Sequence, residues 1–175
     1  MSPVVMSPVE LARAELLALL AELADARRRL GLLADEIVRL DPGPGATADR
    51  GTLAIVAIDL HSYYTTIESL LERIMVALEG AAPTGPAAHT ELLRHAQRAL
   101  PSLRPAILAG AQREDLDELR RFRHFFRHAY ALELRQDKLR RALDPFAGLH
   151  RRVDEDLAAF GAFLRSLLDE LAVPS

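Results

Sequence analysis

The sequence contains no cysteine and no tryptophan, and Lys138 is its only lysine. The absence of cysteine excludes disulfide bridges, thiolate zinc sites, iron–sulfur clusters and a cysteine nucleophile. Glycine is scarce, at nine residues in 175, while 50% of the chain is hydrophobic, which argues against a disordered or collagen-like protein. We therefore expect one folded domain covering residues 1–175.

Long apolar runs are also missing. No stretch reaches the ~18 uninterrupted apolar residues of a membrane span, and the first residues lack the basic and apolar regions of a secretory signal. The formal net charge of −3 gives no overall attraction to nucleic acid or to anionic lipid, so binding to either needs a local patch. We expect a cytoplasmic protein that does not associate with membranes.

Helical signals begin near the N-terminus. Ser7 and Glu10 have the spacing of a capping box, and Pro8 suits the first position of a helix. Leucine and isoleucine then recur mostly at steps of three and four residues as far as Leu40, which predicts one long helix. Asp41–Arg50 is predicted to be a loop, because it contains two prolines and two glycines.

Helical periodicity continues through the rest of the chain, and no alternating pattern of a strand appears. Ala81–Ala87 is predicted to be a second loop, and Asp144–Pro145 a break within the last helix. The further helices are predicted at Thr52–Leu78, His89–Leu100, Glu114–Leu132 and Gln136–Leu171. The economical architecture is an all-α antiparallel bundle of four to five helices.

The densest polar segment runs from Arg120 to Tyr130 and holds four arginines, two histidines and three phenylalanines in eleven positions. Phe122, Phe126 and Tyr130 are spaced four residues apart, which predicts a stripe that faces the core. The arginines and histidines occupy the other faces. One interpretation is a solvated basic face whose charges pair with the acidic stretch Glu114–Glu118.

A second interpretation comes from the order of residues in this segment. Arg123, His124, His128 and Tyr130 form the pattern R-x4-H-x-Y, with a polar residue directly after the arginine. The pattern resembles the signature of HEPN ribonucleases, specifically of HepT-type toxins. Leu60–Ile74 also resembles the second-helix segment of HepT-like proteins, so that the likeness spans roughly residues 50–170.

The resemblance implies a dimerising all-helical toxin of a toxin–antitoxin system that cleaves RNA at a shared cleft without a metal or cofactor. Arg123 and His128 would be the catalytic residues, and His124 and Arg127 would support them. Histidine, with an ordinary pKa of ~6.5, exchanges a proton near neutral pH. The planar guanidinium of Arg123 suits the charge that builds on a phosphoryl group during cleavage. The alternative is a non-catalytic HEPN protein that only binds a nucleotidyltransferase partner or a nucleotide.

Helix geometry restricts how these two residues meet. Residues five apart on a regular helix lie ~140° apart around its axis, so Arg123 and His128 do not share a face. Either the helix is irregular, or the arginine side chain wraps around it, or the second subunit of a homodimer completes the cleft. We favour the last arrangement.

Tyr130 has two interpretations. It is either a core aromatic or, as the resemblance implies, the tyrosine that a minimal nucleotidyltransferase antitoxin AMPylates. An added AMP brings a negative charge and bulk next to His128, which opposes RNA binding.

Three residues on the predicted second helix are further candidates. His61, Tyr64 and Glu68 share one face, where they either pair structurally or support the site from a neighbouring helix. Glu91 with His95, and Glu114 with Glu118, lack the further ligands that a metal site needs. Asp154–Asp156 is expected to be solvated helix surface.

Overall fold

The computed structural model describes residues 6–46, 48–128 and 136–172; the side chains at 125, 127, 128 and 136–138 lie outside this description. Within these ranges the regular elements are helices and there is no strand, which confirms the predicted all-α fold class. The described ranges hold six α-helices rather than four to five, because the last predicted segment divides at Asp144 and Pro145. They are α1 (Pro8–Leu40), α2 (Arg50–Glu79), α3 (Ala88–Ala96), α4 (Arg113–His128), α5 (Gln136–Leu143) and α6 (Phe146–Glu170), with a short 3-10 turn at Gly110–Gln112.

Local signals in the sequence account for the ends of the long helices. The Ser7 hydroxyl accepts a hydrogen bond from the Glu10 amide at 3.2 Å, and the Ser7 amide donates to the Glu10 carboxylate at 2.7 Å. This is the predicted capping box. Asp49 caps α2 by accepting from the amides of Gly51 and Thr52. Gly80 ends α2 with a φ of 81°, a left-handed conformation that glycine adopts without strain.

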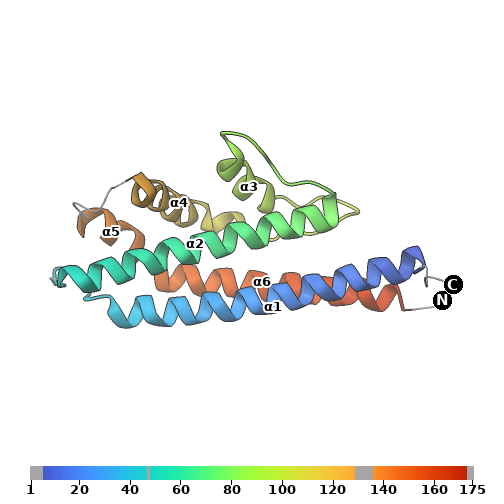
Figure 1. The fold of residues 1–175 in the computed structure, drawn as a ribbon, viewed down its shortest axis with the longest axis horizontal. Helices are drawn as coiled ribbons and strands as arrows, with labels where there is room; N and C mark the ends of the chain where they lie inside the picture. The colour runs from blue at the N-terminus through green and yellow to red at the C-terminus, as the bar shows by residue number, and fades with distance from the viewer. Residues whose placement is uncertain (1–5, 47, 129–135, 173–175) are drawn as a thin grey trace, which may run out of the picture.

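The helices form two layers that meet at α2. α1 packs along both α2 and α6, while α3, α4 and α5 lie on the side of α2 away from α1 (Figure 1). Gly161 allows α6 to approach α1 closely, since an added Cβ there would lie 3.2 Å from Leu23 Cδ2. The core is a continuous cluster of buried apolar side chains to which the helices of both layers contribute. α2 is therefore in contact with both layers, and it is the helix against which the basic segment packs.

The aspartates of the run Asp154–Asp156, which we expected to be solvated helix surface, also contact other parts of the chain. Asp154 accepts two hydrogen bonds from Arg27, at 2.8 and 3.0 Å, and so ties α6 to α1. Asp156 accepts from the Ala109 amide at 2.7 Å and from Gln112 at 2.5 Å. The acidic run on α6 thus contacts two other parts of the chain. These contacts could not be expected from the run itself, because the partner residues are distant in the sequence.

Two apolar residues of α2 are more exposed than the sequence pattern predicts. Ile55 and Ile58 belong to the apolar pattern that predicts this helix, yet they are 47% and 52% exposed. No helix in the described part of the chain is long and apolar enough to cross a membrane.

Candidate functional site

The basic segment forms the second half of α4, and its apolar stripe faces α2. Leu119 and Phe122 are buried, and the ring of Phe122 stacks on that of Phe126 with centroids 6.1 Å apart. The stripe predicted from Phe122 and Phe126 is confirmed. Arg120 pairs with Asp117 at 3.0 Å and Arg121 with Glu118 at 3.2 Å, so these two arginines follow the interpretation of a paired surface.

Arg123 behaves differently from its neighbours. Its Nη1 lies 3.1 Å from Oε2 of Glu68 on α2, and the two side chains are only 14% and 5% exposed. The ring of Tyr64, also on α2, lies with its centroid 6.0 Å from the Arg123 Cζ. The motif arginine is therefore fixed between two helices by a carboxylate and an aromatic ring.

A third helix reaches the same carboxylate. The Nδ1 of His89, in the first turn of α3, lies 2.8 Å from Oε1 of Glu68. Glu68 thus has a partner on each oxygen, Arg123 from α4 and His89 from α3. A charged carboxylate with this little exposure needs such partners, because its removal from water costs more than one weak contact returns.

Burial dominates the acid–base properties of this cluster. It raises the pKa of Glu68 above the ordinary value for a glutamate, although the positive charge of Arg123 and the contact with His89 act in the opposite direction. Burial also raises the pKa of Tyr64, so its hydroxyl stays protonated at neutral pH. The cluster therefore presents a fixed guanidinium beside a neutral phenol.

The three candidates on α2 all lie against neighbouring helices at this point. Glu68 and Tyr64 contact Arg123, and the ring of His61 lies 5.4 Å from that of Phe126 by centroids. The predicted face is therefore turned toward α4. Sequence reasoning missed His89, whose only signal is its place just after the Ala81–Ala87 loop.

Comparison with protein families matches residues 55–164 to a family model described as HepT-like protein. The chain belongs to the HepT-like family. The match runs from α2 into α6 and includes Glu68, Arg123 and the rest of the R-x4-H-x-Y segment. No curated protein and no solved structure gives a match.

Membership of the HepT-like family suggests a toxin–antitoxin protein of the HEPN type. The other motif positions are described only in part. α4 extends to His128, but the side chains of Arg127 and His128 lie outside the described residues, and Tyr130 lies there entirely. His124 is exposed on α4.

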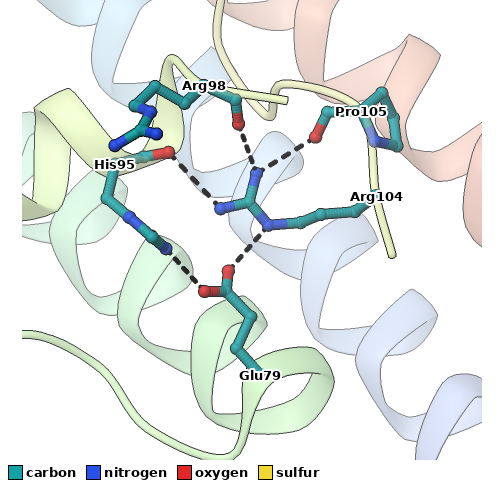
Figure 2. Close-up of polar contacts among 5 residues, drawn as sticks. All are labelled: Glu79, His95, Arg98, Arg104 and Pro105. Atoms are coloured by element: carbon teal, nitrogen blue, oxygen red, sulfur yellow. Dashed lines mark hydrogen bonds and ion pairs between the residues drawn. The ribbon is translucent and has the colours of Figure 1, made fainter. Parts of the chain in front are cut away.

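A second polar cluster in this HepT-like protein was not predicted. The guanidinium of Arg104 is fully buried and donates to Glu79 Oε1 at 2.7 Å and to the carbonyls of Arg98, Pro105 and His95 at 2.9, 3.1 and 3.3 Å (Figure 2). The Nε2 of His95 lies 2.5 Å from the second Glu79 oxygen. The cluster joins the end of α2 to the chain after α3.

This cluster explains why α3 is shorter than predicted. The helix ends at Ala96 instead of Leu100, because the chain turns back so that the amide of Ile107 donates to the Ala96 carbonyl at 2.8 Å. His95 faces Glu79 and not a metal ligand set. Within the described residues, no three histidine, aspartate or glutamate side chains come together as a metal site.

Proposed function

We propose that this HepT-like protein is the toxin of a toxin–antitoxin system, a metal-independent endoribonuclease whose catalytic residues are Arg123 and His128. One observation carries the proposal: among the arginines of the run whose side chains the structure describes, the motif arginine is the one that a buried carboxylate holds in place. A surface arginine has no need of such a partner. An arginine that contacts the transition state does need a partner that holds it in place, because a displacement of about 1 Å can lower the rate ~10²-fold.

The proposed chemistry is an internal transesterification. His128 takes the proton from a ribose 2′-hydroxyl, and the 2′-oxygen forms a bond to the adjacent phosphorus. The bond from phosphorus to the 5′-oxygen breaks, and that oxygen receives a proton as it leaves. Arg123 donates hydrogen bonds to the phosphoryl oxygens while their negative charge increases. The products are a 2′,3′-cyclic phosphate and a 5′-hydroxyl.

We place the cleft between two subunits. The ~140° between positions 123 and 128 on a regular helix separates the two side chains on one subunit. Ile55 and Ile58, in the first turns of α2, are each about half exposed, and they support a subunit contact at that end of the helix. In such a homodimer the arginine of one copy would act with the histidine of the other.

Tyr130 is the proposed site of control. A minimal nucleotidyltransferase partner would transfer AMP to its hydroxyl, two residues from His128, and the added phosphodiester would repel RNA. Tyr130→Phe keeps the ring and removes the acceptor oxygen. This variant should cleave RNA almost normally and gain no AMP when treated with the partner and ATP. An AMP adduct on the variant in intact mass spectrometry would show that another residue is the site.

Cleavage in EDTA tests the catalytic assignment. The purified, unmodified protein is incubated with single-stranded RNA beside His128→Ala and Arg123→Ala. Loss of a general base costs ~10²–10⁴-fold, so the His128 variant should be almost inactive. Arg121→Ala is the matched control, because Arg121 is an exposed arginine on the same helix that pairs with Glu118. Equal cleavage by all four proteins would indicate a contaminant and overturn the proposal.

A non-catalytic HEPN protein is the second candidate, and the burial of Arg123 favours it. An arginine that is 14% exposed and already neutralised by Glu68 is also what a purely structural ion pair requires. On this alternative the unmodified protein would bind a nucleotidyltransferase or a nucleotide and leave RNA intact. The same EDTA assay separates the two functions.

A further inference from the structure

A polar groove lies between α1 and α2, on a part of α2 that the proposed catalytic residues do not use. Its volume is about 450 Å³, within the range of ~300–1,000 Å³ that ligand pockets occupy. The α2 side of the groove extends from His61 to Arg73, which is about 18 Å along a helix. The groove is thus elongated and follows the helix axis.

The formal charges that line the groove balance, because Glu22 and Asp25 stand against Arg29 and Arg73, and Arg73 also pairs with Glu15 at 2.8 Å. Two acids line it, but Glu22 pairs with Arg73 at 2.7 Å and Asp25 pairs with Arg28 at 2.8 Å. Arg29 also lines the groove and is exposed, and it forms no ion pair or hydrogen bond with any residue that the structure describes. Arg29 is therefore the charged group of the groove that is available to an anionic ligand.

Hydroxyl groups line the opposite wall. Ser62, Thr65 and Ser69 have helical spacing and share one face of α2. Ser69 is exposed, so its hydroxyl can meet a ligand oxygen in the groove.

The groove ends beside the motif helix. His61 lines the groove, and its ring contacts Phe126, which lies between Arg123 and His128 in the sequence of α4. A strand that leaves the proposed cleft past Phe126 would enter the groove at this end.

We propose that this groove binds the sugar–phosphate backbone of single-stranded RNA next to the cleaved linkage; this inference rests on the proposed function. Arg29 binds a phosphate, and the hydroxyls of Ser62 and Ser69 bind phosphate or ribose oxygens. Side chains of these types make most protein contacts to nucleic-acid backbones, and such contacts position the strand without reading its sequence. The groove therefore sets the affinity for RNA and leaves the chemical step to α4.

The test measures binding and cleavage separately. A fluorescent 2′-O-methyl oligoribonucleotide, which cannot form the cyclic phosphate, is titrated with the full-length protein at several salt concentrations and followed by anisotropy. Arg29→Ala should weaken binding about fivefold to tenfold and reduce the salt slope by about 0.7, the value for one phosphate contact on a single strand. Arg151→Ala is the control, since Arg151 is an exposed arginine on α6 outside the groove; its affinity should stay within about twofold.

Ser69→Ala is the second variant, because it removes only an exposed hydroxyl of the groove. It should weaken binding about threefold while the salt slope stays unchanged, since no charge is lost. Cleavage of ordinary RNA at saturating concentration should proceed at the wild-type rate for both Arg29→Ala and Ser69→Ala.

Each result decides one of the two claims. If Arg29→Ala binds RNA as Arg151→Ala does while cleavage is normal, the groove assignment is wrong and the proposed function stands. If Arg29→Ala instead changes the sedimentation coefficient and leaves RNA affinity unchanged, the groove is a subunit contact and the inference is overturned. If the wild-type protein neither binds nor cleaves RNA, both claims fail.

Discussion

Replacing Arg104 by alanine should destabilise the protein more than any other single arginine substitution among the described residues. The side chain is fully buried and donates to four acceptors, the Glu79 carboxylate and three backbone carbonyls (Figure 2). Breaking a buried ion pair costs ~3–5 kcal/mol, and each buried acceptor left without a donor adds to that cost. In this variant Glu79 keeps His95 as a partner and is 13% exposed, which reduces the expected loss of stability. We expect a loss of about 4 kcal/mol in the free energy of unfolding.

Urea unfolding followed by circular dichroism measures this loss. For a chain of this length, 1 kcal/mol lowers the melting temperature by ~2–4 °C, so Arg104→Ala should melt about 8–16 °C lower. Arg98→Ala is the control, because only the backbone carbonyl of Arg98 takes part in the cluster, and its effect should stay within ~0.5 kcal/mol. If Arg104→Ala and Arg98→Ala unfold at the same urea concentration, the cluster does not hold the loop and the reasoning fails.

The cluster also predicts a pH dependence. Burial tends to raise the pKa of Glu79, but the hydrogen bonds from His95 and Arg104 outweigh it, and the pKa lies below its ordinary value of 4.5. A carboxyl group whose pKa is lowered by folding contributes stability above its unfolded pKa and loses it as the pH falls through the folded pKa. The wild-type protein should therefore lose this contribution below about pH 4.5, and Arg104→Ala should lose less over the same range.

Three further predictions concern the site and the core. Glu68→Ala should lower the rate of RNA cleavage about a hundredfold, because Arg123 loses the carboxylate that positions it; a folded variant with the wild-type rate would rule out that role. Mixing inactive Arg123→Ala and His128→Ala subunits should restore about a quarter of the activity if each cleft takes one residue from each subunit. Half of the randomly formed dimers are then mixed, and each mixed dimer has one intact cleft of two. No recovery in mixed dimers would place both residues on one subunit. The Nδ1 of His150 lies 3.0 Å from the Tyr63 hydroxyl, and burial lowers the pKa of His150 from 6.5. The urea midpoint of the wild-type protein should therefore fall as the pH drops below about 6.5, and the midpoint of His150→Gln should fall less. Parallel curves for the two proteins would contradict this.

Much of the fold could be predicted because its signals are local. The capping box at Ser7 and the glycine-rich loop after Asp41 each act within a few residues, and they mark helix ends correctly. The face of α2 that carries Tyr64 and Glu68 could also be predicted, since helical spacing alone places those residues together.

The contacts that complete the site could not be predicted, because they join residues far apart in the sequence. Nothing near Glu68 indicates that Arg123 and His89 arrive from two other helices. Arg104 stands in a segment whose prolines predict only a break, yet it has the most completely buried guanidinium described. The sequence around Asp154 predicts a solvated surface residue, and only the fold shows that Arg27 lies opposite it. Paired charged residues of this kind are of the same residue types as solvated ones. The sequence therefore does not distinguish them, because the difference lies in their partners in the fold.

The chemistry of the RNA ends left by cleavage tests the central claim most directly. The unmodified wild-type protein and His128→Ala are incubated with a defined oligoribonucleotide in EDTA, and the product termini are identified by mass spectrometry. The account predicts 2′,3′-cyclic phosphate and 5′-hydroxyl ends from the wild-type protein and almost none from the variant. Products with 5′-phosphate ends, or the same products in equal amounts from both proteins, would contradict it.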